Sequence, residues 1–369
     1  MHLKNLNLIQ FRNFRQQELA LSPRLNVFVG PNGSGKSNCL EAVHVLASGR
    51  SHRGADAKHL IQWQTDGFSL KGEFEEAEET LRFEVKQPLN RAREIRLNGR
   101  PCRRLKEWVG LVPIVAFSPD DLNWVKGEPV LRRKVANDVL SQVDVHYLEA
   151  LQMYGKIVTE RNAALRRIQE GELSAAELDP WDLSLLKYGM QLSVARKNWI
   201  REFSVLVNEK HNRLSGRKER IELVYKPAFS LEGTDRENQD RNHQRIRELR
   251  DAEIALGATL KGPHRDDIDM VLDGSAAKHY ASQGQQRTVA LAVVLAQRDY
   301  LAQRLGRWPV CLLDDVFSEL DQDRRAELVA FMSDMGQCLI TVTSVQDWPS
   351  AVPMASLYEV REGRIRSTN

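Results

Sequence analysis

The sequence predicts an α/β protein with a mixed sheet, an antiparallel β part and an inserted helical arm. A strand, a glycine-rich loop and a helix follow one another in residues 25–49. Strand-like segments over 68–106 suggest antiparallel β-structure, and helical apolar spacing replaces them from about 130 to 220. Buried-strand patterns return after residue 262. We therefore predict a head formed by 1–128 and 258–369, with its antiparallel part at about 68–106, and an arm formed by 129–257.

Composition restricts the classes of protein to which the chain can belong. Its 369 residues suffice for two ordinary domains or for one domain with a large insertion. The net charge is only +3, so nucleic-acid binding would have to come from a local basic patch. The four cysteines are far apart and predict small core residues in a reducing compartment, not disulfides or metal ligands. Neither a secretory signal nor a membrane-length apolar run is visible, and we expect a cytoplasmic protein.

The head and the arm differ in their local patterns. Residues 25–29 predict a strand, a helix begins near Lys36, and Asn98-Gly99 indicates a two-residue hairpin turn. In the arm, periodic patterns beginning near Tyr147 and Leu185 predict two antiparallel helices, each too short for a long coiled coil. The polar stretch 232–250 predicts a mobile loop leading into a charged helix. The segments "PVCLLDD" and "QCLITVTS" predict two further buried strands.

The glycine-rich loop "GPNGSGKS" matches the phosphate-binding pattern G-x-x-x-x-G-K-[ST] and lies between a strand and a helix, as that pattern requires. Its glycines let backbone N–H groups surround phosphate oxygens, while the helix directs its positive end at the same anion. Lys36 would reach the β- and γ-phosphates of ATP, and the Ser37 hydroxyl would bind Mg²⁺. The expected ATP-binding residues are Gly30, Pro31, Asn32, Gly33, Ser34, Gly35, Lys36 and Ser37.

The apolar segment "PVCLLDD" delivers two carboxylates at the end of a strand. This is how proteins with a phosphate-binding loop place a second metal anchor beside the γ-phosphate. We expect Asp314 to hold Mg²⁺ and Asp315 to orient the attacking water or to accept its proton. A solvated acidic turn is the alternative for this pair taken alone, and the glycine loop argues against it.

The stretch "ASQGQQRTVALAVVLAQ" opens with a polar turn and continues as a buried helix. Ser282 and Gly284 place a hydroxyl and exposed backbone N–H groups at a helix N-terminus, which favours an anion. One nucleotide already has its loop at 30–37, so this turn would serve the nucleotide of a second copy in a two-fold symmetric dimer. An ordinary polar helix cap is the alternative.

These motifs together resemble the RecF family of recombination mediators, relatives of the SMC and Rad50 heads in the ABC-ATPase class. The resemblance is carried by "LKNLNLIQFRNFR", "FSPDDL", "GPHRDD", "SQGQQRTVALA" and "LLDDVFSELDQDRR", in this order along the chain. It implies an ABC-type ATPase head in which Ser282, Gly284 and Gln285 form the signature turn and Asp321 belongs to the D-loop at a dimer interface. It also implies that the protein forms an ATP-dependent homodimer on DNA. The implied activity is that of a weak, DNA-stimulated ATPase that acts as a switch. RecR and RecO are the implied partners, and RecA the recombinase loaded at single-strand gaps.

The sequence departs from the broader ABC pattern in three places. Asp315 stands where many ABC proteins carry Glu, and Thr343-Ser344 follows the last buried strand without a His. No clear Q-loop glutamine is present, although "FSPDDL" falls in that region. Because Asp is shorter than Glu, we expect slow hydrolysis.

The DNA-contacting surface is left open by the sequence. The hairpin that carries Arg100, Arg103 and Arg104 could neutralise several phosphates without reading bases, or it could be a solvated face that never meets DNA. His264 and Arg265 in "GPHRDD" could be interface, nucleotide-sensing or structural residues. The sequence does not choose between single-stranded DNA, double-stranded DNA and a gap junction.

Two other functions compete with this one. The nucleotide-binding subunit of a transporter is disfavoured because the chain between Ser37 and Ser282 is about twice the length that such subunits have. An SMC- or Rad50-like tethering head remains the runner-up. It demands long heptad repeats and a hinge or a Cys-x-x-Cys hook, and none of these is visible.

Overall fold

The computed structural model of this chain describes residues 1–216, 219–317, 322–333, 336–348 and 356–368. The chain divides into two units. The first comprises Met1–Leu122, Leu206–Arg220 and Ser282–Asn369, and the second comprises Asn123–Val205 and Ile221–Ala281. Residues 206–220 thus belong to the first unit and 258–281 to the second, whereas the predicted domain limits assign them the other way round.

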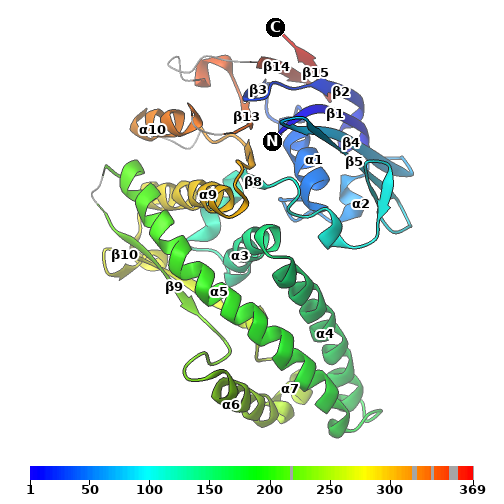
Figure 1. The fold of residues 1–369 in the computed structure, drawn as a ribbon, viewed down its shortest axis with the longest axis vertical. Coiled ribbons are helices and arrows are strands. Elements are labelled where there is room, and N and C mark those ends of the chain that lie inside the picture. The colour runs from blue at the N-terminus through cyan, green and yellow to red at the C-terminus, as the bar shows by residue number, and fades with distance from the viewer. Residues whose placement is uncertain (217–218, 318–321, 334–335, 349–355, 369) are drawn as a thin grey trace. The chain divides into compact units, whose positions relative to one another are not determined.

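A largely parallel sheet carries the glycine loop in the first unit (Figure 1). Its strands are β3 (Leu25–Val29), β8 (Ile114–Phe117), β12 (Val310–Leu313), β13 (Cys338–Val342), β14 (Ser356–Arg361) and β15 (Arg364–Ser367). Their order is β15-β14-β3-β13-β12-β8, and only β15 runs antiparallel to its neighbour. Every residue of β12 and β13 is buried, which is why these strands read as continuous apolar runs in the sequence.

An antiparallel sheet forms the second layer of this unit. It contains β1 (His2–Phe11), β2 (Phe14–Ala20), β4 (Gly67–Glu76), β5 (Glu79–Pro88), β6 (Glu94–Leu97) and β7 (Arg100–Cys102), in the order β2-β1-β4-β5-β6-β7. Asn98 and Gly99 link β6 to β7 with φ angles of 50° and 79°, the left-handed pair that a tight hairpin needs. The predicted antiparallel part and its hairpin are confirmed.

Helix α1 (Lys36–Ser48) lies between the two sheets, where it contacts β1, β4 and β5 on one side and β8, β12 and β13 on the other (Figure 1). Its residues Cys39 to Ala47 are all buried, and they join both sheets in one apolar core. The first unit also contains α2 (Ala57–Leu60), α9 (Gln283–Leu305) and α10 (Gln322–Ser333). The α/β fold predicted from the sequence is confirmed.

Helices dominate the second unit, which contains α3 (Pro129–Val143), α4 (Val145–Gln169), α6 (Asp235–Glu248), α7 (Arg250–Leu256) and α8 (Ala277–Tyr280). Helix α5 (Asp179–Leu214) begins in this unit and ends in the first. A small antiparallel sheet has the order β11-β10-β9, formed by β9 (Ile221–Lys226), β10 (Asp267–Leu272) and β11 (Ser275–Ala276). Helices α4 and α5 run antiparallel beside each other, as predicted (Figure 1). No helix in the described part of the chain is apolar enough over a sufficient length to span a bilayer.

The charged helix predicted within 232–250 is present, but it occupies most of the stretch that was expected to begin as a loop. Helix α6 occupies Asp235–Glu248, and a capping box fixes its start: Glu237 N–H donates to Thr234 Oγ1 at 3.3 Å, and Thr234 N–H donates to Glu237 Oε2 at 2.8 Å. The T-x-x-E pattern that forms this box is present in the sequence. The high polarity of the stretch hid it, because only Asn238, Asn242 and Ile246 of this helix are buried.

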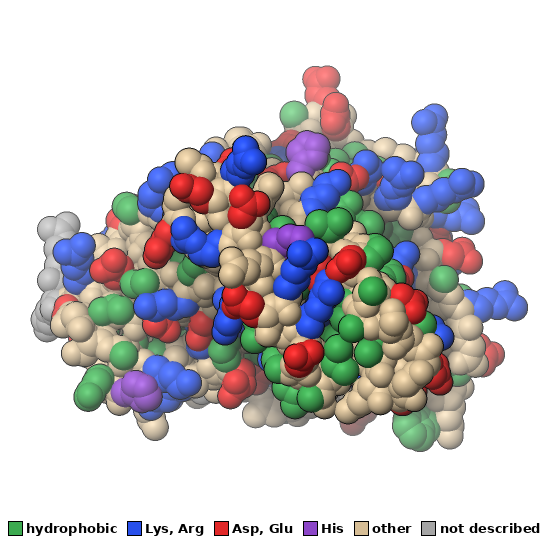
Figure 2. Space-filling view, turned by 90° about the horizontal axis from the view of Figure 1, so that it is seen from below, with side chains coloured by type: hydrophobic (Ala, Val, Ile, Leu, Met, Phe, Trp, Pro, Cys, Tyr) green, Lys and Arg blue, Asp and Glu red, His purple; other side chains and the backbone are tan. Residues whose placement is uncertain are grey.

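Charges of both signs are mixed on the surface. Figure 2 shows Lys and Arg side chains interspersed with Asp and Glu over the face that it views. Since the net charge is only +3, this mixing is what the composition leads one to expect.

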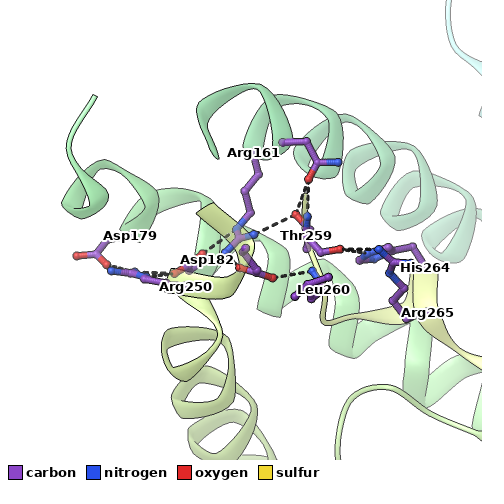
Figure 3. Close-up of polar contacts among 10 residues, drawn as sticks. Arg161, Asp179, Asp182, Arg250, Thr259, Leu260, His264 and Arg265 are labelled. Atoms are coloured by element: carbon purple, nitrogen blue, oxygen red, sulfur yellow. Dashed lines mark hydrogen bonds and ion pairs between the residues drawn. The ribbon is translucent and has the colours of Figure 1, made fainter. Parts of the chain in front are cut away.

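A buried ion network organises the second unit (Figure 3). The Arg161 guanidinium is fully buried and donates to Asp182 at 2.8 Å and to Glu253 at 2.6 Å. It also donates to the Thr259 hydroxyl at 3.0 Å. Arg250 donates to the second oxygen of Asp182. Removing one partner of such a network would leave an uncompensated buried charge, so these residues fix how α4, α5 and α7 meet.

The same network holds the "GPHRDD" segment, where His264 has a defined protonation state. One ring nitrogen, Nε2, lies 3.0 Å from the Thr259 carbonyl oxygen, which can only accept a hydrogen bond. The other, Nδ1, therefore accepts from the Tyr154 hydroxyl at 2.6 Å. Burial, together with the nearby Arg265, Arg133 and Arg161, lowers the pKa of His264 to about 4. His264 is thus a neutral structural residue at pH 7.

Because the pKa of His264 falls from 6.5 to about 4 on folding, its stabilising contribution is complete above pH 6.5 and is lost as the pH falls toward 4. The expected loss at pH 5 is about 2 kcal/mol. The His264→Gln variant can make both hydrogen bonds without titrating, so its melting temperature should fall less than that of the wild type between about pH 7.5 and pH 5. An equal fall in both proteins would contradict the assigned protonation state.

Candidate nucleotide site

The glycine loop connects β3 to α1, and its backbone cannot carry side chains at two positions. Gly35, which caps α1, has a φ of 114°, and a Cβ there would lie 2.5 Å from the Asn13 side-chain amide. A Cβ on Gly30 would lie 2.2 Å from the carbonyl oxygen of Val360. The loop is therefore packed against Asn13, near the start of the chain, and against Val360, near its end, which leaves no room for a side chain at either glycine.

Lys36 and Ser37 open helix α1 at the mouth of this loop. Lys36 is 6% exposed, and its Nζ donates to the carbonyl oxygens of Gly30 and Pro31 at 2.6 and 3.0 Å. Burial lowers the pKa of the Lys36 ammonium, and the carboxylates of Asp315 and Asp314 offset part of that shift. The ammonium is thus held back against the loop by two carbonyl groups, from where it can reach an anion in the cavity.

Asp314 joins the loop to the end of β12. Its Oδ1 accepts from the Ser37 hydroxyl at 2.9 Å and from the Thr341 hydroxyl at 2.6 Å. Thr341 Oγ1 in turn accepts from the backbone N–H of Asp315 at 2.8 Å. Asp315 has a φ of 47°, so the chain turns sharply directly after the strand. Thr341 is a site residue that the sequence analysis did not select.

These residues surround a cavity of about 360 Å³. It is lined by residues of the glycine loop, by the ends of β12 and β13, and by Ser118, Pro119 and Asp120 of "FSPDDL". Ser34 Oγ is buried and has no hydrogen-bond partner within the described part of the chain. A hydroxyl and a carboxylate side by side, as at Ser37 and Asp314, are oxygen ligands of the kind that Mg²⁺ prefers. The residues present therefore fit a nucleotide phosphate with a divalent cation.

Several residues that support this site escaped the sequence analysis. The Asn13 amide donates to the Ser34 carbonyl oxygen at 2.9 Å and accepts from the Asn38 amide at 2.9 Å. Arg12 pairs with the buried Glu41 of α1 through two hydrogen bonds of 2.8 and 2.9 Å. Both contacts start in the short turn between β1 and β2, which the sequence analysis treated only as part of the resemblance.

The turn at 282–285 is at the N-terminus of α9 and is not among the described segments that line this cavity. Ser282 caps the helix, its hydroxyl accepting from Gln285 N–H at 3.2 Å, while Gln285 Oε1 accepts from Ser282 N–H at 2.7 Å. Gly284 lies next to the Arg324 guanidinium, 3.8 Å from the position of a Cβ. The turn is thus a capping box with a cation beside it, and both its dipole and this cation favour an anionic ligand.

The remaining predicted residues are Asp321 and three arginines. Asp321 falls outside the described residues. Arg100, Arg103 and Arg104 are all exposed, at and after the short edge strand β7. The structure brings together the loop, Asp314 and Asp315 but does not include these arginines in the cavity.

Comparison with known proteins identifies the family. The model of the RecF/RecN/SMC N-terminal domain matches residues 2–365. The protein from Heliobacterium modesticaldum named DNA replication and repair protein RecF is 35% identical over 371 residues, with 100% of both chains covered. Its namesake from Acidothermus cellulolyticus is 37% identical, with 99% of both chains covered.

The chain belongs to the RecF family.

Solved structures agree with this membership. A structure titled as the recombination mediator RecF with ATP in the RecFOR pathway has a TM-score of 0.91 and 29% identity, and the match covers 100% of this chain and 98% of that one. The SMC head domain of Pyrococcus furiosus has a TM-score of 0.55 at 15% identity, which shows a shared fold alone. This RecF-family chain therefore has the ATPase-head fold that the resemblance predicted.

Replacing Asp315 by Asn tests its proposed role. Asn tolerates a positive φ as well as Asp does, so the turn after β12 should be kept while the charge is lost. We expect Asp315→Asn to bind Mg²⁺-ATP normally and to hydrolyse it about a hundredfold more slowly, measured by nucleotide titration and phosphate release. The matched variant Asp314→Asn should instead weaken Mg²⁺-ATP binding. Unchanged turnover in Asp315→Asn would move the catalytic role to another residue.

Proposed function

We propose that this RecF-family chain is an ATP-dependent DNA-binding protein of replication and recombinational repair, acting in the cytoplasm as a dimer that ATP closes on DNA. The observation that carries the proposal is the contact of Ser37 with Asp314, which joins the glycine loop to the acidic end of β12 at 2.9 Å. This pair is the arrangement by which a phosphate-binding loop and a strand-end carboxylate share one Mg²⁺. Two relatives support the same proposal: one is named a DNA replication and repair protein, and the other is a recombination mediator solved with ATP.

The loop and its neighbouring side chains in the cavity then have distinct roles. Mg²⁺-ATP, when bound, would supply the β–γ phosphoanhydride bond whose hydrolysis to ADP and phosphate resets the switch. The loop N–H groups and Lys36 neutralise phosphate charge, and Ser37 and Asp314 hold the cation. Asp315 orients the attacking water. Its short side chain makes hydrolysis slow, which suits a weak ATPase that times a DNA-bound state.

A second copy of the chain would complete the site. The turn formed by Ser282, Gly284 and Gln285 is at the N-terminus of α9, where Ser282 is exposed, and in our proposal it binds the γ-phosphate of the partner subunit's ATP. Asp321 would lie at the same interface. The first unit of each copy would thus hold one nucleotide, which gives two per dimer, and the second unit would extend the surface offered to DNA.

The partners follow from the family. A solved relative is titled a recombination mediator in the RecFOR pathway. We therefore propose RecR and RecO as protein partners that help this chain to load RecA at single-strand gaps. A tethering role of the SMC or Rad50 kind is the weaker candidate, because helices α4 and α5 span only 25 and 36 residues.

Sedimentation velocity tests the proposal directly. The protein should be monomeric alone and with ADP, dimeric with ATP, and bound as a dimer to gapped DNA when ATP is present. A protein whose sedimentation is the same under all of these conditions would not be an ATP-driven switch.

The Ser282→Arg variant tests the site in trans. An arginine at the N-cap should exclude the partner's phosphate from the helix N-terminus, so ATP binding to the monomer should persist while ATP-induced dimerisation is lost. The control is Ser174→Arg, since Ser174 forms the same kind of capping box with Glu177 in the second unit and should leave dimerisation intact. Loss of nucleotide binding to the Ser282→Arg monomer would place Ser282 in its own subunit's site.

Replacing Arg100, Arg103 and Arg104 by Ala tests the DNA surface. DNA affinity should fall similarly for all sequences, and the dependence of log K on log salt should flatten by up to about 0.9 for each lost phosphate contact. ATPase activity without DNA should stay at the wild-type level. The control variant loses the same net charge elsewhere: Ala replaces three arginines of β14 and β15, namely Arg361, Arg364 and Arg366. An unchanged salt slope in the first variant would exclude the hairpin as the contact.

A further inference from the structure

The C-terminal end of helix α5 contacts both α9 and α10. Lys210 of α5 forms an ion pair with Asp299 of α9. The Arg213 guanidinium stacks on the ring of Phe331 in α10, 4.1 Å from its centroid. Because α9 begins at the 282–285 turn, the position of this helix end bears on how the turn is held.

Glu219, five residues after the end of α5, contacts the turn itself. Its Oε1 accepts from the Gln285 side-chain amide at 2.7 Å, and its Oε2 lies 3.2 Å from Nε2 of His211, whose side chain is fully buried. One oxygen of the Glu219 carboxylate therefore contacts His211 of α5, and the other contacts Gln285 in the turn.

This contact reinforces one orientation of the Gln285 amide. A carboxylate can only accept hydrogen bonds, so Glu219 selects the NH₂ end of the amide. The oxygen of Gln285 must then face the other way, where it accepts from Ser282 N–H at 2.7 Å. The capping box sets the same preference by itself, because the turned amide would oppose two donors at Ser282, and Glu219 adds a second, charged acceptor that favours the same orientation.

We propose that Glu219 is a positioning residue for the site that binds the partner subunit's nucleotide. It acts through Gln285, whose amide orientation it reinforces, so that the capping box of Ser282 stays closed and the N-terminus of α9 keeps one conformation. The inference rests on the proposed function, because the turn matters in this way only if it meets a second subunit's ATP. It adds a residue from outside every nucleotide motif of the sequence.

A turn held by its own capping box alone predicts a different outcome. In that case Ser282 and Gln285 would suffice, and changes at residue 219 would leave the turn unchanged. Hydrogen bonds to a charged acceptor are stronger than neutral ones, so the loss of the Glu219 contact should be measurable.

The experiment compares Glu219→Ala, Glu219→Gln and the control Glu222→Ala, whose glutamate is exposed on β9. Hydrogen exchange of the backbone amides of Gln285 and Gln286 is measured without nucleotide, and dimer affinity is measured with ATP. We expect Glu219→Ala to speed this exchange and to weaken ATP-induced dimerisation by about tenfold or more, with monomer ATP affinity unchanged. Glu219→Gln should restore both properties, since its amide oxygen can accept the same hydrogen bond. Glu222→Ala should match the wild type.

The outcomes separate this inference from the proposed function. Wild-type exchange and dimerisation in Glu219→Ala would overturn it, and so would equal losses in Glu219→Ala and Glu219→Gln, because the hydrogen bond would then not be what matters. If Glu219→Ala exchanges faster but the wild type forms no dimer with ATP, the role of Glu219 in holding the turn is supported and the proposed dimer is refuted. Unfolding temperatures of all variants identify a simple loss of folding.

Discussion

The hydrogen bonds that meet at Asp314 join the parts of the site. Ser37 begins α1, Asp314 ends β12 and Thr341 lies in β13, yet both hydroxyls donate to one carboxylate oxygen. The strand order β3-β13-β12 brings these ends to the same edge of the sheet, as parallel strands must. A shift in the register of β12 or β13 by one residue would turn Asp314 or Thr341 to the opposite face and separate the three groups.

The glycine loop depends on packing as much as on its own sequence. Gly35 is approached by the Asn13 amide and Gly30 by the Val360 carbonyl oxygen, so both positions need the absence of a side chain. The β1–β2 turn reaches further through Arg12, which pairs with Glu41 inside the core. The antiparallel sheet therefore contacts the phosphate-binding segment through its β1–β2 turn, and α1 packs against strands of both sheets.

The second unit uses its charges internally. Arg161, Arg196 and Arg132 are all buried and are bonded to Asp182, Asp266 and Asp267, respectively. Such pairs contribute little net stability because each ion loses its hydration, but they penalise every arrangement that leaves one of them unpaired. Many of the unit's arginines thus fix geometry and do not serve as a basic surface. The net charge of +3 follows separately from the composition, which has 53 basic and 50 acidic residues.

The sequence by itself determined the elements whose signals are local. The glycine loop, its flanking strand and helix, the acidic end of β12 and the Asn98-Gly99 turn each depend on backbone conformation or periodicity within a few residues. The capping box of α6 was also local, but the polarity of its surroundings hid it. Only the tertiary structure selected Asn13, Thr341 and Glu219, which are ordinary polar residues in the sequence. Their roles come from contacts across 21, 27 and 66 positions, and no short pattern encodes the distance between two side chains that the fold alone brings together.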